Sequence, residues 1–251
     1  MKKIIFIGAG NIATNLAINL AKNNYQIIQI FSKSLVNAKI LADKVNANAT
    51  NDLSKIKTAD IIILSIKDDI IEDVLKLHHF ENIVHTSGFK DLNVFGTKVK
   101  NFGSLYPIQT FNKKINIDLS ETPFLIECSN KEFEKTIIKL AHSLSSNVIK
   151  INSEQRKKIH LAAVYACNFS NRMIGIAKEI MEINNLDFSL IQPLIKQTLK
   201  KISEGDPNQL LTGPAKRKDV QTIQNHLKLI QNSDHKKIYQ LISQDIMNLE
   251  E

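Results

Sequence analysis

Hydrophobic residues follow two alternating patterns along the first 150 residues of the chain. Short apolar runs, of the kind that form buried strands, lie at residues 3–7, 26–31, 59–66, 82–88, 99–107, 122–127 and 147–151. Between several of these runs the apolar residues recur with helical spacing, at residues 11–22, 36–45, 69–77 and 131–145. This alternation is typical of an α/β domain with a doubly wound parallel sheet.

The pattern changes after Asn152, where strand-like runs stop and helical spacing takes over. One long helix is expected over about 154–184, with apolar residues at Ile159, Ala163, Ala166, Phe169, Met173, Ile176, Ile180 and Ile183. Further helices are expected at about 188–203, 219–232 and 234–249, with a loop-rich connector at 204–219. We therefore predict two domains, an α/β domain over 1–152 and a helical domain over 153–251.

The sequence GAGNIA, from Gly8 to Ala13, follows the first predicted strand and precedes the first predicted helix. It matches the G-x-G-x-x-A pattern of dinucleotide-binding folds, in which glycines allow a tight turn and close approach of the pyrophosphate. Free N–H groups at the helix N-terminus would bind that pyrophosphate. The cofactor contacts predicted from this motif are Gly8, Ala9, Gly10, Asn11 and Ile12. The alternative is a glycine turn that binds no ligand.

The second predicted strand ends in FSKS, from Phe31 to Ser34, without an acidic residue. An acid at this place commonly holds the ribose 2′-OH of NAD, and it would repel the 2′-phosphate of NADP. Ser32, Lys33 and Ser34 instead offer two hydroxyl groups and an ammonium group, which suit a phosphate. We therefore predict NADP as the cofactor, and the alternative is an ordinary polar turn.

Two further strand ends should face the same crevice, because doubly wound sheets bind ligands at the carboxyl ends of their strands. The strand ADIIILSI ends at Ser65 and Ile66, which we predict to line the cofactor. The strand that runs into HTSG places Ser87 near the cofactor and Gly88 near a substrate. The two aspartates at 68–69 are expected to cap the next helix.

The composition narrows the classes of function. The net charge is +8, but the lysines are scattered among acids, tryptophan is absent and no recognition motif occurs, so nucleic-acid binding is not expected. No apolar run reaches the roughly 18 residues of a membrane span, and the N-terminal strand does not resemble a signal peptide. Cys128 and Cys167 lie far apart, which favours a cytoplasmic, reducing setting. His78 and His79 would point in different directions on a helix, so no metal site is expected.

Five segments carry a resemblance to a known family. They are GAGNIA, HTSG, GSLYPIQTF at 103–111, HLAAVYACNFSNRM at 160–173 and LTGPAKRKDVQTIQNHL at 211–227. Together they resemble bacterial Rossmann-like proteins whose C-terminal helical domain is known only as a domain of unknown function. That group is similar to the β-hydroxyacid dehydrogenase and pyrroline-5-carboxylate reductase class, and deazaflavin-dependent NADP reductases share a similar N-terminal domain.

The resemblance implies a Rossmann domain followed by an all-helical domain like that of 6-phosphogluconate dehydrogenase. It also implies NADP(H) binding and a homodimer formed through the helices, but no particular substrate. Two positions depart from the group's pattern. Tyr106 stands where a histidine before proline is common, which calls a histidine-based proton donor at this loop into question. Lys218 stands where glycine is common, and lysine adopts positive φ less readily.

Several residues have side chains suited to hydride-transfer chemistry, which needs a proton donor and groups that hold the substrate. His160 and Asn168 lie about two turns apart on the long helix, where the imidazole could donate a proton and the amide could bind the substrate. The alternative is a helix face that packs on the first domain. Tyr106 and Gln109, in YPIQ, could also donate a proton and bind substrate, although a half-buried structural tyrosine is common.

Arginine occurs at only three positions, Arg156, Arg172 and Arg217, which favours places where the planar guanidinium matters more than its charge. Arg217 could bind a substrate carboxylate with two hydrogen bonds, or it could pair with an acid of the protein. Asp219 is expected to cap the helix at 220–231.

These observations predict an NADP(H)-dependent oxidoreductase that transfers a hydride to or from a small carbonyl, imine or 2-hydroxy compound. The predicted catalytic residues are His160, Asn168 and Tyr106, and the predicted substrate contacts are Gly88, Gln109 and Arg217. The alternative is a non-catalytic NADP-binding sensor or assembly module, which the tyrosine at position 106 keeps open.

Overall fold

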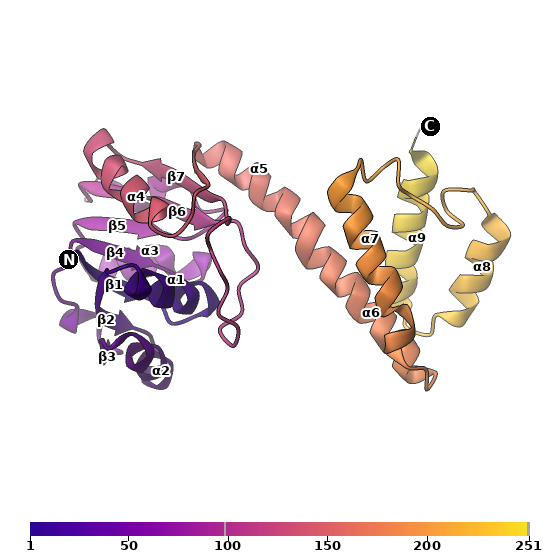
Figure 1. Cartoon of the computed structure of the whole chain (residues 1–251), viewed down its shortest axis with the longest axis horizontal. Helices are drawn as coiled ribbons and strands as arrows, with labels where there is room; N and C mark the ends of the chain where they lie inside the picture. Colours follow the sequence, from indigo (N-terminus) through magenta and orange to yellow (C-terminus); the bar gives the residue numbers. More distant parts are fainter. Residues whose placement is uncertain (98, 250–251) are drawn as a thin grey trace. The chain divides into compact units, whose positions relative to one another are not determined.

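The computed structural model describes residues 1–97 and 99–249, and the chain forms two compact units (Figure 1). The first unit comprises residues 1–167, and the second begins at Asn168. The boundary between the units lies inside a helical stretch that begins at Ser153. The division into domains at residues 152 and 153 stays a prediction.

The first unit is built on one sheet with the strand order β3-β2-β1-β4-β5-β6-β7-β8. The strands are β1 (Lys3–Ile7), β2 (Gln26–Phe31), β3 (Asn48–Thr50), β4 (Ile61–Leu64), β5 (Asn82–His85), β6 (Asn101–Pro107), β7 (Phe124–Cys128) and β8 (Val148–Lys150). Its α-helices are α1 (Asn11–Lys22), α2 (Leu35–Val45), α3 (Ile71–Leu77), α4 (Lys131–His142) and α5 (Ser153–Ala163). The described residues of this unit also form the 3₁₀ turns η1 (Leu53–Lys55), η2 (Asp68–Ile70) and η3 (Leu92–Phe95). This strand order is that of a dinucleotide-binding sheet, so the predicted fold class is confirmed.

Helices cover both faces of the sheet, and β1 supplies both hydrophobic cores. Ile4 and Phe6 pack in the core that contains residues of α1, α2 and α4. Ile5 and Ile7 point to the opposite face and pack in the core that contains residues of α3 and η3. All four side chains are fully buried, as expected for a central parallel strand. The centre of the sheet therefore holds the carboxyl ends of β1 and β4 firmly in place.

Two features of the sheet were not predicted. β7 runs antiparallel to β6, and β8 then runs parallel to β7, so the sheet is mostly but not wholly parallel. Antiparallel neighbours need no crossover helix, and the loop at 108–123 joins β6 to β7 without one. The short strand β3 has the sequence NAT, which contains no apolar run that would reveal it.

The predicted helix at about 154–184 exists, but it is interrupted. α5 begins with a capping box in which Asn152 Oδ1 accepts from the Gln155 N–H and Gln155 Oε1 accepts from the Asn152 N–H. A π-helical segment, η4 (Val164–Phe169), then separates α5 from α6 (Ser170–Ile183). Segments of π-helix change the side on which later residues lie and are frequent at functional sites.

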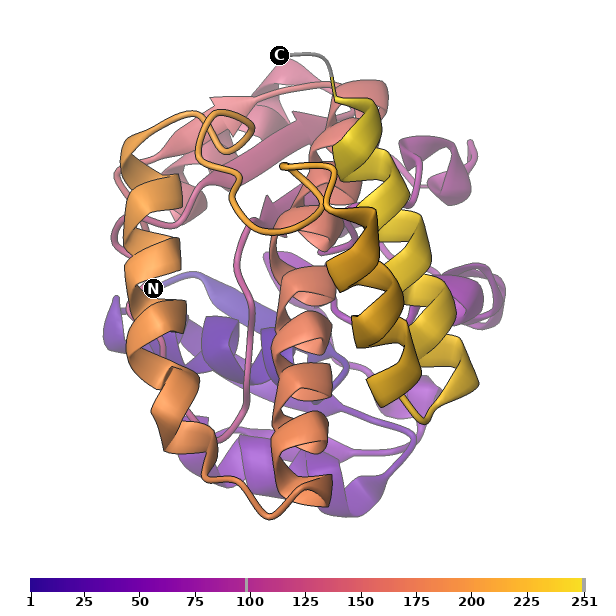
Figure 2. The same cartoon turned by 90° about the vertical axis from the view of Figure 1, so that its right-hand side faces the viewer.

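The second unit consists of helices joined by turns and by a longer connector at 205–219. After α6 come η5 (Phe188–Ile191), α7 (Gln192–Glu204), α8 (Val220–Leu229) and α9 (Ser233–Asn248). α8 and α9 lie side by side, joined by a 2.8 Å hydrogen bond between His226 Nδ1 and the Tyr239 hydroxyl (Figure 2). Asp219 caps α8 as predicted, since its carboxylate accepts from the Thr222 N–H. Within the described part of the chain, every helix is too short or too polar to cross a membrane.

Candidate functional site

The glycine turn after β1 lies against the end of β4. Gly8 has φ 122°, a left-handed value that favours glycine. A Cβ atom at this position would collide with the Ser65 carbonyl group and would come within 3.2 Å of Ile66 Cγ2. The Gly8 N–H donates to Phe31 O at 2.8 Å, which ties the turn to β2. The fold itself therefore requires glycine at position 8, whether or not a ligand is bound.

The first turn of α1 has room for a ligand. Gly10 is the N-cap residue and is exposed, and a Cβ atom added to it would meet no atom of the described residues within 4 Å. The N–H groups of the next residues, Asn11, Ile12 and Ala13, have no carbonyl partner within an α-helix. The first turn also contains no acidic residue. Free donors, the positive end of the helix and open space together fit the pyrophosphate of a dinucleotide.

Asparagines of α1 hold the long loop between β6 and β7 against this helix. Asn15, which is 1% exposed, donates from Nδ2 to Asn112 O at 3.2 Å and accepts from the Ile117 N–H at 3.2 Å. The Lys113 N–H donates to Asn11 Oδ1 at 3.1 Å. The loop therefore lies beside the open end of α1. The sequence interpretation missed this, although asparagine recurs every four residues along one side of an otherwise apolar helix.

The predicted 2′-phosphate loop lies at the end of β2. Ser32 is half-buried and its N–H donates to Thr50 O at 3.1 Å, whereas Lys33 and Ser34 are exposed. Ser34 is the N-cap of α2, and its Oγ accepts from the Asn37 N–H at 3.3 Å. The hydroxyl of Ser34 keeps its own proton for a further acceptor. The loop thus presents hydroxyl groups and an ammonium group next to a helix N-terminus.

Side chains join the ends of β4 and β5. Thr86 Oγ1 donates to Ser65 Oγ at 3.1 Å. Ser87 Oγ donates to Asp68 Oδ2 at 2.7 Å and accepts from the N–H groups of residues 89–90. These three bonds use the whole hydrogen-bonding capacity of the Ser87 hydroxyl, so this side chain fixes its loop.

The prediction that Asp68 and Asp69 cap the next helix is wrong. Among the described residues, the N-cap positions of η2 and α3 are Lys67 and Ile70, and neither side chain forms a capping hydrogen bond. The carboxylate of Asp68 is instead used by Ser87, because the loop after β5 comes close to the loop after β4.

Tyr106 and His160 meet over Gly88. The Tyr106 hydroxyl lies 2.9 Å from His160 Nδ1, and the two rings meet edge to face at 83°. A Cβ atom at Gly88 would lie 2.6 Å from His160 Cγ and 2.8 Å from Tyr106 Cζ, so only glycine admits both rings. Burial, with a smaller contribution from Cys167, raises the pKa of the Tyr106 hydroxyl. The tyrosine therefore keeps its proton near neutral pH.

Arg156 docks the helix that carries His160. Its side chain is fully buried, and Nη1 donates to Glu127 Oε2 at 2.6 Å. Nη2 donates to Lys90 O at 2.5 Å and to Ser153 Oγ at 3.1 Å. α5 is thereby connected to β7 and to the loop that follows Gly88. The planar fork explains why this rare arginine stands here, as its scarcity had suggested.

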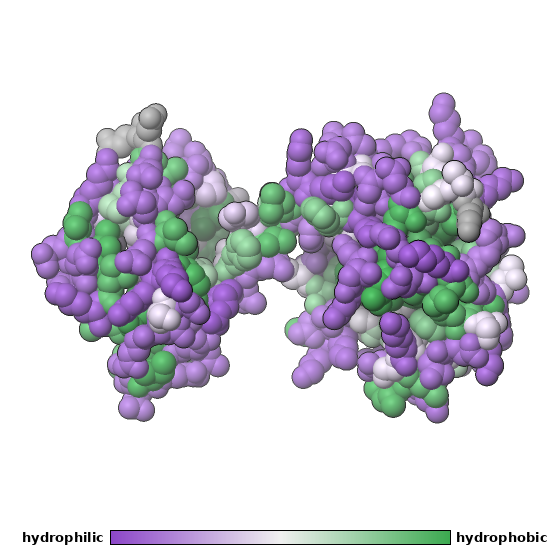
Figure 3. All heavy atoms as spheres, turned by 180° about the vertical axis from the view of Figure 1, so that it is seen from behind, coloured by the Kyte–Doolittle hydropathy of each residue, from purple (hydrophilic) through white to green (hydrophobic). Residues whose placement is uncertain are grey.

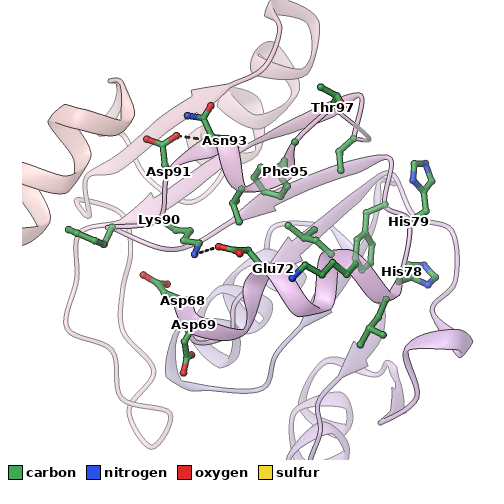
Figure 4. Close-up of a pocket in the computed structure, with 18 of the residues that line it drawn as sticks. Asp68, Asp69, Glu72, His78, His79, Lys90, Asp91, Asn93, Phe95 and Thr97 are labelled. Atoms are coloured by element: carbon green, nitrogen blue, oxygen red, sulfur yellow. Dashed lines mark hydrogen bonds and ion pairs between the residues drawn. The ribbon is translucent and has the colours of Figure 1, made fainter.

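A groove of about 1090 Å³ runs along α3 in the first unit (Figure 4). Its floor is apolar, and its rim carries the Lys90–Glu72 ion pair at 2.7 Å and the Lys157–Asp91 pair at 3.1 Å. Asp68 lies at the end nearest the loop after β5. Neither the glycine turn nor the Tyr106–His160 pair lines this groove, so it is a different feature from the candidate site.

The remaining predicted residues lie elsewhere. Gln109 is exposed at the start of the loop that docks on α1, and its Oε1 accepts from the Thr110 N–H at 2.8 Å. Asn168, in η4, and Arg217 belong to the second unit, and both are exposed. Lys218, beside Arg217, has φ 56°, so the connector does adopt the left-handed conformation that a glycine would favour.

Comparisons with known proteins show which families this chain is similar to. Residues 3–85 match the model of the family described as NADP oxidoreductase coenzyme F420-dependent, and residues 122–246 match a domain of unknown function, DUF2520. The sequence is 38% identical to the putative NADP oxidoreductase BF3122 from Bacteroides fragilis, over 99% of this chain and 98% of that chain, with a TM-score of 0.93. No curated protein matches the chain.

More distant structures share the fold. Protein TM1727 from Thermotoga maritima is 25% identical, with 97% of this chain and 96% of that chain covered and a TM-score of 0.68. The 1-pyrroline-5-carboxylate reductase from Streptococcus pyogenes is 17% identical, with 99% of both chains covered and a TM-score of 0.64.

The fold and the glycine turn thus define a Rossmann-type dinucleotide-binding protein with a helical C-terminal region. The chain belongs to the NADP oxidoreductase family that combines these two matched domains. The predicted resemblance is therefore confirmed, and NADP is the cofactor of that family.

Proposed function

We propose that this chain is an NADP(H)-dependent oxidoreductase that transfers a hydride to or from a small carbonyl, imine or 2-hydroxy compound. The observation that carries the proposal is the Tyr106–His160 hydrogen bond of 2.9 Å over Gly88. It joins a protonated phenol to an imidazole, a pair suited to proton transfer.

The residues at the strand ends fit the cofactor. The open first turn of α1 at Gly10 would hold the pyrophosphate, and Ser32, Lys33 and Ser34 would hold the 2′-phosphate. Ser65, Ile66 and the backbone at Ser87 complete the proposed contacts. When bound, NADPH supplies the hydride.

Tyr106 and His160 would provide the proton that a reduced carbonyl or imine takes up. When His160 is neutral with its proton on Nε2, Nδ1 accepts from the Tyr106 hydroxyl; when the imidazole is charged, Nδ1–H donates to the same oxygen. The pair can therefore pass one proton in either direction, as reduction and oxidation require. Gly88 lets the two rings approach each other.

This geometry counts against the non-catalytic alternative. The reason for that alternative was Tyr106, which stands where the resembling proteins commonly have a histidine. His160 brings an imidazole to the same loop from α5, so a titratable proton donor is present beside it.

We assign substrate binding to Gln109, Asn168 and Arg217 from their chemistry. The amides can donate to a carbonyl or accept from the N–H of a protonated imine, and the exposed guanidinium of Arg217 suits a carboxylate. Replacing Arg217 by lysine keeps the charge but removes the planar fork. The affinity for a carboxylate substrate should therefore fall before the rate of turnover does.

We also propose that the chain forms a homodimer through the second unit. This unit has few buried apolar residues, whereas many large ones are exposed (Figure 3). The exposed residues include Ile180, Ile183, Leu186, Leu190, Leu194, Leu199 and Ile202. A patch of this kind usually marks an interface. Light scattering should therefore give a dimer for the native chain and a monomer for Leu194→Glu.

The first test is a titration of the purified chain with NADPH and with NADH, followed by a screen of carbonyl and imine substrates.

Tyr106→Phe and His160→Gln should lower kcat by about a hundredfold or more, with unchanged NADPH affinity. The second unit offers a matched control, because His226 and Tyr239 form a similar pair. Tyr239→Phe should leave kcat unchanged. Full activity in both site variants would refute the assignment, and NADPH binding without any turnover would favour a sensor.

A further inference from the structure

A row of polar side chains crosses the sheet beneath the Tyr106–His160 pair. His85 on β5 is paired in register with Ser104 on β6, and Ser104 is paired with Glu127 on β7. Residues paired in this way point to the same face of a sheet. His85 and Ser104 are both fully buried, which is unusual for polar residues in the middle of a sheet.

Arg156 covers this row. The Arg156 guanidinium donates to Glu127 at one end of the row. At the other end, the charge of the guanidinium contributes to the lowered pKa of His85. Ser104 stands between Glu127 and His85 in the sheet register, so we group it with the guanidinium in one buried cluster.

Three buried atoms of this cluster have no hydrogen-bond partner among the described residues: His85 Nε2, Ser104 Oγ and Arg156 Nε. His85 Nδ1 accepts from the Ser87 N–H at 3.2 Å, so the proton of the neutral imidazole lies on Nε2. His85 Nε2 and Arg156 Nε are therefore both donors, and neither can satisfy the other. Buried polar groups left without partners are rare and costly.

We propose that His85, Ser104 and Arg156 bind a buried water molecule, and that this hydrated cluster positions His160 against Tyr106. A water molecule supplies what the cluster lacks, because its oxygen can accept from both N–H donors while one of its hydrogens is donated to Ser104 Oγ. Three polar partners are typical of a buried water.

The positioning role follows from the chain connections, and it rests on the proposed function of His160. Ser104 and Tyr106 are two residues apart on β6, so they lie on one face of the strand. Arg156 and His160 are four residues apart and lie on one side of α5. His85 leads directly into the loop that contains Gly88. β6 and α5 thus each contribute one residue to the cluster and one to the Tyr106–His160 pair, and the loop after β5 contributes Gly88, which both rings approach.

A crystal structure of the full chain, at a resolution that shows ordered waters, tests the binding site. We expect one water within hydrogen-bond distance of all three atoms. A dry interior, or direct hydrogen bonds among the three side chains, would overturn the proposal. This outcome does not depend on whether the protein turns over a substrate.

NMR titration of the His160 ring in the free protein tests the positioning role. Ser104→Ala and His85→Phe each remove one partner of the water, and the phenyl ring keeps the stacking on Phe95. Both should shift the His160 midpoint by about half a pH unit or more. His85→Gln, which restores an N–H donor, should bring the midpoint back towards the native value.

Ser145→Ala is the matched control, because it removes a buried, hydrogen-bonded hydroxyl elsewhere in the unit. It should leave the His160 midpoint unchanged. An unchanged midpoint in Ser104→Ala and His85→Phe would overturn the positioning role even if the water is present. If Ser104→Ala does not fold, the comparison of His85→Phe with His85→Gln decides the question.

Discussion

Gly88 and His160 are so close that a Cβ atom added to Gly88 would lie 2.6 Å from the imidazole ring. The same atom would lie 2.8 Å from Tyr106 Cζ, so Gly88→Ala must push the two rings apart. We predict that this variant loses the Tyr106–His160 hydrogen bond and about a hundredfold in kcat, at a stability cost of about 1–3 kcal/mol. Kinetic measurements and thermal unfolding check both parts.

NADPH affinity should stay within about threefold of the native value in Gly88→Ala, because the glycine turn is untouched. Gly175→Ala is a suitable control, since a Cβ atom at this helical position makes only ordinary contact, 3.4 Å from Arg172 Nη1. Native kcat in Gly88→Ala would mean that the ring pair plays no part in turnover.

The two glycines of the turn should respond differently to alanine. At Gly8 the positive φ and the collision with the Ser65 carbonyl group predict a loss of more than about 3 kcal/mol. At Gly10 the backbone is ordinary and nothing lies within 4 Å, so stability should change by no more than about 1 kcal/mol. NADPH affinity in Gly10→Ala should nevertheless fall tenfold or more, about 1.4 kcal/mol, because the methyl group occupies the space assigned to the pyrophosphate.

Urea unfolding without ligand and fluorescence titration with NADPH separate these two effects. If Gly10→Ala binds NADPH as tightly as the native chain does, the pyrophosphate does not approach this turn.

The FSKS loop should decide between NADPH and NADH. Lys33 is exposed at the end of β2, so Lys33→Ala should weaken NADPH binding and leave NADH binding unchanged. Ser32→Asp should go further and reverse the preference, because a carboxylate repels the 2′-phosphate and can hold the ribose 2′-OH. Lys44→Ala removes another exposed lysine at the far end of α2 and is the control for net charge. Equal loss of both nucleotides in Lys33→Ala would show that the loop does not contact the 2′-phosphate.

Local patterns in the sequence were sufficient for the glycine turn and the sheet core. The run KIIFI and the spacing of the following helix depend on burial and on backbone preferences that act within a few residues. The antiparallel direction of β7 was not predictable in the same way, because apolar content does not encode strand direction.

The candidate site was only partly predictable. Tyr106 and His160 were each chosen for their chemistry, but they are 54 residues apart and nothing in their spacing pairs them. Their contact depends on Arg156, whose bonds dock α5 on the sheet. The roles of Asp68 and Ser87 were missed for the same reason, since their bond joins two loops that only the folded sheet brings together.

Lys218 should be a source of strain in the second unit. Its φ of 56° is left-handed, which disfavours a lysine but not a glycine. We predict that Lys218→Gly stabilises the chain by up to about 1 kcal/mol in urea unfolding, partly offset by the larger entropy of the unfolded chain. Lys216→Gly, in the same connector but without positive φ, should be neutral or destabilising. A destabilised Lys218→Gly would mean that side-chain contacts of the lysine outweigh its backbone strain.

His85 should make the stability of the chain depend on pH. Burial, and secondly the charge of Arg156, lowers the pKa of His85 from 6.5 to about 3. Between these values the unfolded chain binds a proton at this position and the folded chain does not. The free energy of unfolding therefore falls as the pH is lowered through this window, by up to about 1.4 kcal/mol for each pH unit. Above about pH 6.5 the imidazole is neutral in both states and contributes no pH dependence.

Urea unfolding measures this contribution. It is carried out near pH 7 and near pH 5 on the native chain, His85→Phe and His85→Gln. Neither variant has a titrating group at position 85, so the native chain should lose about 2 kcal/mol more than either variant over this interval. Subtracting the loss of a variant from the loss of the native chain cancels the pH dependence that carboxylates contribute to both. One such carboxylate is Asp91, whose pKa is lowered chiefly by the hydrogen bond from the Asn93 N–H. Equal losses in all three proteins would show that His85 takes up its proton at the ordinary pH in the folded state. The surroundings of His85 would then be far more polar than its burial among Phe95, Ser104 and Arg156 implies.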